Sequence, residues 1–126
     1  MKPPRNIGLL LEHAAGAARP TFVLDRPYDI APDGGQRYDV AATATLVAET
    51  SAVLWQAGLR RGDRLAIVKD NHFDNPLLAA AAARIGALPA MISDAVAPEA
   101  LAVMMQRLAP RVLVASPAVL TAAAAA

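Results

Sequence analysis

The stretch Gly58-Leu59-Arg60-Arg61-Gly62-Asp63-Arg64-Leu65-Ala66-Ile67-Val68 decides the fold of this chain. Gly58 suits the left-handed position that follows the last turn of a helix, and Arg61-Gly62-Asp63 predicts a tight turn. The strand that follows, Leu65 to Val68, is apolar on both faces. We therefore expect an internal strand of a parallel sheet that helices cover on both sides.

Before this stretch the sequence predicts a short helix, a hairpin and a long helix. The expected elements are a helix over 7–17, antiparallel strands over 21–25 and 36–40, and a helix over 41–57. Asp33-Gly34-Gly35 indicates a turn and not a phosphate loop, because no helix begins directly after it. The long helix is expected to bury one stripe of residues: Leu46, Val47, Thr50, Val53, Leu54 and Ala57. Trp55 lies off this stripe and is expected to pack against a neighbouring element.

After this stretch, helices and strands alternate with short connections. The expected elements are a loop over Lys69 to Asp74, a helix that Asn75 caps and Gly86 ends, a strand over 88–92, a helix from Pro98 with Leu101, Met104, Met105 and Leu108 inside, an internal strand over 111–115, and a helix from Ser116-Pro117. Pro89 should lie at the start of its strand or on an edge. This order predicts an α/β fold with βαβ layers, right-handed crossovers and a small N-terminal β-hairpin.

Composition excludes several function classes. The 126 residues are 56% hydrophobic, carry a net charge of +1 and contain no cysteine. Disulfides and thiolate metal sites are excluded, and no basic run points to nucleic acid. The longest apolar run, Leu77 to Ala83, is far shorter than the ~20 residues of a membrane helix. With no signal sequence apparent, a cytoplasmic protein is expected.

Candidate chemistry falls in loops that follow the predicted strands, where open α/β sheets bind ligands. Lys69 and His72, in the polar run Lys69 to Asp74, are the candidate catalytic side chains, as anion contacts or general acid–base groups. The alternative interpretation of this run is a solvated loop. Ser93-Asp94 and Ser116 are ordinary loop and capping residues at the other two strand ends.

No firm catalytic motif is present. The chain contains no G-x-x-x-x-G-K-[ST], G-x-G-x-x-G or G-x-S-x-G sequence. His13 has no partner at metal-ligand spacing and is expected on the surface. We therefore assign no cofactor-binding residue, no metal ligand and no complete catalytic set within these residues.

An ordered series of segments resembles the early part of the adenylate-forming enzymes: acyl-CoA synthetases, peptide synthetase adenylation domains and luciferase-like ligases. The series begins with Trp55-Gln56-Ala57-Gly58-Leu59 and the Arg60 to Ile67 turn and strand, which resemble G-V-x-x-G-D-R-V-A-I. Leu77 to Ala90 resembles the family's L-A-x-x-x-A-G-A-x-x-x-P segment. Pro98 to Val114 resembles the helix and strand that follow this segment in the family. In Arg37-Tyr38-Asp39-Val40 the tyrosine of the family's T-Y-x-E-L is present without its glutamate. Ala90 to Asp94 replaces a proline-rich segment and favours the acid–CoA ligase branch.

The resemblance implies an ATP- and magnesium-dependent reaction of a longer protein. A carboxylate would attack the α-phosphate of ATP, and a thiol of CoA or a carrier protein would then take the acyl group. The family's phosphate loop and catalytic lysine would lie downstream, so this stretch alone is expected to be inactive. Its partners would be the remainder of the synthetase chain, the acid and the thiol, with no nucleic acid or membrane.

The expected organisation is a flexible N-terminus over 1–6 and a partial N-terminal α/β subdomain over 7–126. The closing alanines, Ala122 to Ala126, carry no cap or charge and suggest a chain that continues or side chains that were not assigned. Two alternatives stay open. One is a stand-alone, non-catalytic α/β binding module, and the other is a small enzyme that uses the Lys69 to Asp74 run.

Overall fold

A three-stranded parallel sheet forms the centre of the molecule. The computed structural model describes residues 5–15 and 21–125. The strands are β3 (Arg64–Lys69), β4 (Leu88–Ser93) and β5 (Val112–Ala115), in the order β4-β3-β5. Every residue of β3 after the first is buried, which confirms the internal strand that the apolar sequence predicts.

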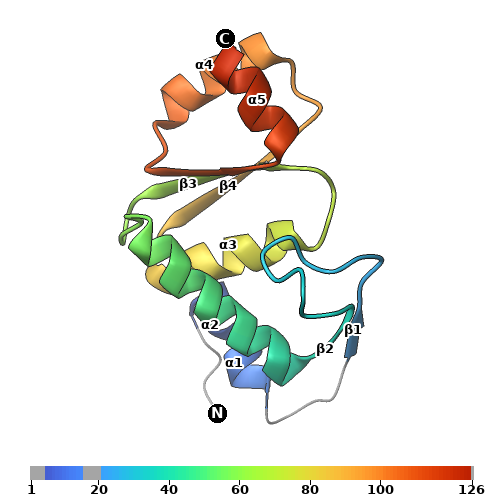
Figure 1. Cartoon of the computed structure of the whole chain (residues 1–126). Helices are drawn as coiled ribbons and strands as arrows, with labels where there is room; N and C mark the ends of the chain where they lie inside the picture. The colour runs from blue at the N-terminus through green and yellow to red at the C-terminus, as the bar shows by residue number, and fades with distance from the viewer. Residues whose placement is uncertain (1–4, 16–20, 126) are drawn as a thin grey trace.

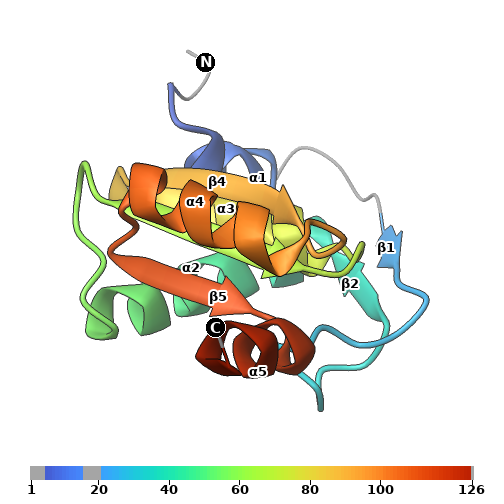
Figure 2. The same ribbon diagram turned by 90° about the horizontal axis from the view of Figure 1, so that it is seen from above.

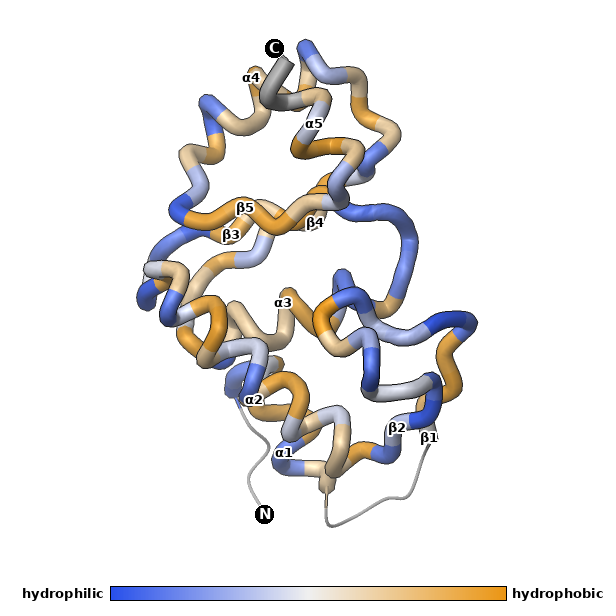
Figure 3. Tube along the Cα trace, in the orientation of Figure 1, coloured by the Kyte–Doolittle hydropathy of each residue, from blue (hydrophilic) through white to orange (hydrophobic). Residues whose placement is uncertain are grey.

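Helices cover both faces of this sheet (Figures 1 and 2). One layer holds α2 (Val40–Gln56) and α3 (Asp74–Ile85), with η1 (Ile7–Leu9) and α1 (Leu10–Ala14) beside them. The other layer holds α4 (Pro98–Leu108) and α5 (Pro117–Ala125). In Figure 3 the hydrophobic residues follow the strands, whereas the connection from β3 to α3 is hydrophilic. No helix in the described part is long and apolar enough to cross a membrane.

The main core lies between the sheet and the α2–α3 layer. Leu65 and Ile67 of β3 are at most 1% exposed, and they belong to one cluster with Leu54 of α2 and Leu77 and Leu78 of α3. Burying each of these aliphatic side chains contributes about 1.5–3 kcal/mol. The stretch that decides the fold therefore places its strand at the centre of this core.

A short hairpin precedes α2. The strands β1 (Thr21–Val23) and β2 (Arg37–Asp39) pair in antiparallel, with Phe22 opposite Tyr38. Both strands are shorter than predicted. β2 ends at Asp39 because this residue also caps α2: its carboxylate accepts a 2.7 Å hydrogen bond from the Ala42 amide. The end predicted for the first helix, at residues 16 and 17, lies outside the described residues.

The buried face of α2 differs from the predicted stripe. Val53 is 63% exposed and Ala57 is also exposed, whereas Ser51 is buried. Ser51 can face α3 because its hydroxyl donates hydrogen bonds to the carbonyl oxygens of Val47 and Ala81. The buried hydroxyl therefore does not lack a hydrogen-bond partner. Trp55 remains 49% exposed and contacts Arg60 of the following turn instead of a neighbouring element.

The helix α3 begins two residues earlier than the sequence predicts, since the prediction has Asn75 as the cap and Pro76 as the first helical residue. The helix begins at Asp74, and Asn75 is not its cap. The side chain of Asn75 instead donates to the carbonyl of Asp70. Lys69 is likewise not a loop residue, because it is the buried last residue of β3.

The far layer is less well covered. β5 is an edge strand of the described sheet, although its sequence predicts an internal one, and its Leu113 is 38% exposed. No residue of α4 is fully buried, and Met104 of its predicted inner face is 43% exposed. β4 is the other edge strand, which confirms the placement of Pro89.

Glycine permits the closest helix contact of the N-terminal segment. A Cβ on Gly8 would lie 2.3 Å from the backbone nitrogen of Arg84, so only glycine lets η1 approach α3 this closely. Asn6 strengthens the contact: its side chain caps η1 and donates to the carbonyl of Ala83. Asn6 and η1 are thereby held against α3, and α1 packs against α2.

Candidate functional site

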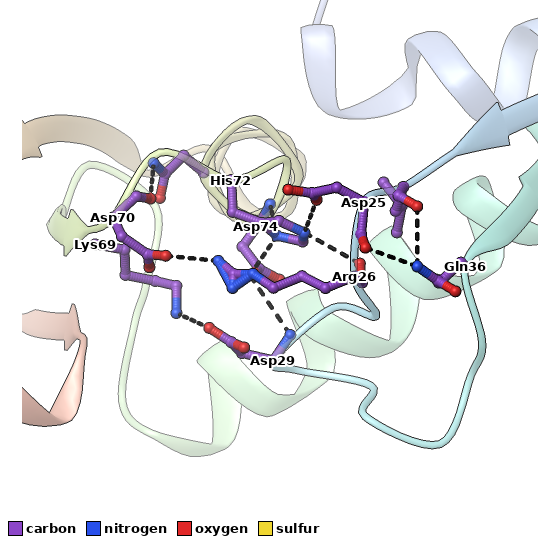
Figure 4. A network of polar contacts seen from close by, with 10 residues as sticks. Asp25, Arg26, Asp29, Gln36, Lys69, Asp70, His72 and Asp74 are labelled. Carbon is purple, nitrogen blue, oxygen red and sulfur yellow. Dashed lines mark hydrogen bonds and ion pairs between the residues drawn. The ribbon is translucent and has the colours of Figure 1, made fainter.

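The polar residues at the carboxyl end of β3 meet the segment that follows β1. Figure 4 shows that Lys69, Asp70, His72 and Asp74 face Asp25, Arg26 and Asp29, and we call these seven residues the polar cluster. Its members come from segments that lie 40 or more residues apart in the sequence. The cluster occupies the edge of the sheet at which open α/β proteins bind ligands.

Two ion pairs join the segments. Lys69 Nζ lies 2.6 Å from Asp29 Oδ2, and Arg26 Nη2 lies 2.6 Å from Asp70 Oδ2. The Lys69 side chain is only 6% exposed, whereas that of Asp29 is 49% exposed. The hydrogen bond from Lys69 lowers the pKa of the Asp29 carboxyl below its ordinary value, against a smaller opposing effect of burial. Lys69 therefore holds a carboxylate of its own chain.

His72 is enclosed on both ring nitrogens. Nδ1 lies 2.8 Å from Asp74 Oδ2, and Nε2 lies 3.2 Å from the carbonyl oxygen of Arg26 and 3.4 Å from Asp25 Oδ1. The side chain is 2% exposed and that of Asp74 is fully buried. A general acid–base group must reach the atom that gains or loses the proton. The contacts of His72 are with its own chain, so the geometry supports a positioning role.

The carboxylate of Asp74 serves two structural purposes. It lies in the first turn of α3, where the helix dipole favours a negative charge. Its Oδ2 faces His72 and also the backbone amide of Asp29, at 3.5 Å. Asp74 therefore links the helix start to the segment that follows β1.

Tyr28 fills the space beneath the cluster. It is fully buried, and its ring lies edge-on to those of Tyr38 and His72, with centroids at 5.1 and 5.9 Å. Burial, and then the charge of Asp74, raise the pKa of the Tyr28 hydroxyl to about 12. The hydroxyl has no hydrogen-bond partner among the described residues. The phenol therefore acts chiefly as a packing group.

The other two predicted positions lie on the opposite face of the sheet. Asp94 and Ser116 help to line a cavity of about 530 Å³ between the sheet, α4 and α5. Val68 also lines it, and because neighbouring strand residues point to opposite faces, Lys69 points away from it. The structure thus brings Lys69 and His72 together and places Asp94 and Ser116 elsewhere. Ser93 accepts a hydrogen bond from the Ala95 amide, as a turn residue does.

The sequence alone did not identify the partners of the cluster. Asp25, Arg26 and Asp29 lie in the turn-rich segment 26–35 or at its border, and no spacing rule relates them to Lys69 or His72. His13 is exposed, as predicted. Within residues 5–15 and 21–125, no group of three His, Cys, Asp or Glu side chains could hold a metal ion.

Comparison with known proteins identifies the family. The sequence model of the AMP-binding enzymes matches residues 12–126. A 3-amino-2-hydroxy-4-methoxybenzoate diazotase of Streptomyces cremeus is 43% identical over 103 residues, which are 81% of this chain and 19% of that protein.

Solved structures show the same fold at lower identity. A Mycobacterium tuberculosis fatty acyl CoA synthetase superimposes with a TM-score of 0.80 at 22% identity, over 95% of this chain and 23% of its own. ATP-bound MatB from Rhodopseudomonas palustris superimposes with a TM-score of 0.71 at 20% identity, over 95% of this chain and 23% of its own. This chain therefore spans about a fifth to a quarter of these relatives. With a family match over most of its length, the chain belongs to the AMP-binding family of adenylate-forming enzymes.

Proposed function

We propose that this chain is the N-terminal segment of an ATP-dependent carboxylate-activating ligase, and that it supplies scaffold and not catalytic groups. The family match over residues 12–126 carries the first part of the proposal. The second part rests on the polar cluster, in which the cations of Lys69 and Arg26 are held by carboxylates of the same chain. At the carboxyl edge of the sheet, where a substrate would be expected, these side chains form ion pairs within the chain.

The ion pairs of the polar cluster argue against an ATP–magnesium site at this edge of the sheet. The carboxylates of Asp29 and Asp70 already bind a lysine and an arginine, so they do not offer a free set of oxygen ligands. In the proposed longer protein, the acid would form an acyl-adenylate with release of pyrophosphate. A thiol of CoA or a carrier protein would then displace AMP. We assign both steps to residues outside this chain.

Exchange of labelled pyrophosphate into ATP tests the proposal. The 126-residue chain should show no acid-dependent exchange, whereas the longer protein that contains it should. In the longer protein, Lys69→Ala should lower thermal stability and leave the exchange rate per folded molecule close to that of the parent. Acid-dependent exchange by the isolated chain would refute the scaffold role.

A second candidate rests on the diazotase of Streptomyces cremeus, whose identity to this chain is 43% against 20–22% for the synthetase and MatB. The name of that relative gives an aminobenzoate as its substrate, which carries an aromatic amine as well as a carboxylate. Turnover of an amino-hydroxybenzoate with ATP and nitrite, followed by the absorbance of the diazo product, would favour this candidate. AMP formation that requires a carboxylic acid and CoA would favour the ligase.

A further inference from the structure

Four arginines gather at the amino end of the sheet, away from the polar cluster. Arg60, Arg61 and Arg64 belong to the turn and first residue of β3, and Arg111 precedes β5. The Arg111 amide bonds the carbonyl of Arg64 at 2.8 Å, so the two segments touch. All four are exposed, and none forms an ion pair within the described residues.

Two of these arginine side chains lie close to glycines that follow helices α2 and α3. The guanidinium Nε of Arg111 lies 3.9 Å from the position that a Cβ would take on Gly58, and the Cγ of Arg61 lies 3.1 Å from the same position on Gly86. The only carboxylate in the turn is Asp63, which accepts from the backbone amide of Arg60. The surface therefore keeps a local excess of positive charge although the whole chain is nearly neutral.

Arg60 is held in place, and one edge of its guanidinium has no hydrogen-bond partner among residues 5–15 and 21–125. Its Nη1 donates to the carbonyls of Trp55 and Leu59, at 2.6 and 2.9 Å. Its Cζ lies 3.7 Å from the centroid of the Trp55 ring. These contacts leave the Nε–Nη2 edge, which is the edge that binds a carboxylate with two parallel hydrogen bonds.

We propose that Trp55, Arg60, Arg61, Arg64 and Arg111 form a docking surface for a carboxylate-bearing segment of a partner protein. Exposed tryptophan and arginine are the residues that contribute most to protein interfaces. The Arg60 fork is already ordered, so a partner carboxylate would not have to immobilise it.

Two other classes of partner fit less well. Nucleic acid needs a basic face or stripe, whereas the chain has a net charge of +1 and its acidic residues are spread along it. A membrane surface would take up the ring of Trp55, but Arg60 already covers one face of that ring. A protein carboxylate uses the free guanidinium edge without disturbing this stack.

Fluorescence gives a direct test, because Trp55 is the only tryptophan of the chain. An acetylated octaglutamate peptide is the probe. It should change the emission of the 126-residue chain in a saturable manner at low salt, and the apparent affinity should fall as salt rises. Arg60→Gln should weaken binding about tenfold, equivalent to about 1.4 kcal/mol. Arg60→Lys should also weaken it, because lysine keeps the charge but lacks the fork.

Arg37→Gln is the matched control, since Arg37 is exposed in β2 beyond the other end of α2. It should leave the affinity within twofold. The proposal fails if octaglutamate gives no saturable change, or if Arg60→Gln and Arg37→Gln bind it equally. It also fails if inorganic phosphate binds as tightly as the peptide. Binding of the chain to phosphatidylserine vesicles that Arg60→Gln weakens to the same extent would overturn the protein partner in favour of a membrane surface.

Discussion

Lys69 Nζ lies 2.6 Å from Asp29 Oδ2, although 40 residues separate the two in the sequence. The ammonium is nearly buried, so the pair fixes the segment after β1 against the end of β3. Removing the carboxylate leaves a buried charge without this partner. We expect Asp29→Ala to lower the free energy of unfolding by about 1–3 kcal/mol.

Denaturant unfolding measures this change. Asp33→Ala is the matched control: Asp33 is an exposed aspartate of the same segment, and its effect should stay within about 0.5 kcal/mol. Equal effects of the two substitutions would show that the pair contributes nothing in solution.

Acid should weaken the same contact. The pKa of Asp29 is lowered from its ordinary value of 3.8 in the folded protein, so the unfolded chain binds the proton more readily. The contribution of Asp29 is therefore fully present above pH 3.8 and is lost as the pH falls through the lower folded pKa. The stability difference between the parent and Asp29→Ala should shrink below pH 3.8. A difference that stays constant down to pH 2 would contradict this.

His72→Ala should act on stability and not on chemistry. The imidazole links Asp74 to the Arg26 carbonyl, so its loss leaves a buried carboxylate underpaired, at a cost of about 1–3 kcal/mol. Amide hydrogen exchange at Asp29 should become faster, because that amide faces Asp74. His13→Ala, at an exposed site, should change neither quantity. Loss of ATP-dependent activity in the longer protein at unchanged stability would instead make His72 catalytic.

Tyr28→Phe should be neutral or up to about 1 kcal/mol stabilising. The phenol is fully buried and its hydroxyl has no bond to another described residue, so removing the oxygen removes only an unmet polar group. Tyr28→Ala should cost about 3–5 kcal/mol, because it opens a cavity. Thermal unfolding of the two variants separates these effects. A clear loss of stability in Tyr28→Phe would show that the hydroxyl is bonded in solution.

Much of the fold follows from local patterns. Gly58 has a φ of 104°, as its position after α2 predicts, and Gly86 ends α3 in the same way, with a φ of 89°. Leu65 to Val68 are buried in the central strand. Helical and strand periodicity arise from residues that are near in sequence, so they can be recognised before any contact is known. The alternation of helix and strand then limits the sheet to a few parallel topologies.

Burial at two helix positions could not be predicted in this way. Hydrophobicity predicts that Val53 lies on the buried face of α2 and that Ser51 does not. In the structure Val53 is exposed and Ser51 is buried. The reason is the Ala81 carbonyl of α3, which accepts from the Ser51 hydroxyl. A polar side chain can be buried where another element supplies its hydrogen-bond partner, and that partner is absent from the local sequence.

The sequence by itself determined the α/β class and the order of the elements, because these depend on periodicity, caps and turns within short windows. Its ordered motifs also carry the resemblance to the family that the AMP-binding match shows. Only the tertiary structure decided which groups Lys69 and His72 contact. Their partners, Asp29, Arg26 and Asp74, come together through the packing of the hairpin segment on the end of β3. Charge pairing acts over a few ångströms of space and not along the chain. The sequence around Lys69 and His72 therefore did not reveal the carboxylates of the same chain that both side chains contact.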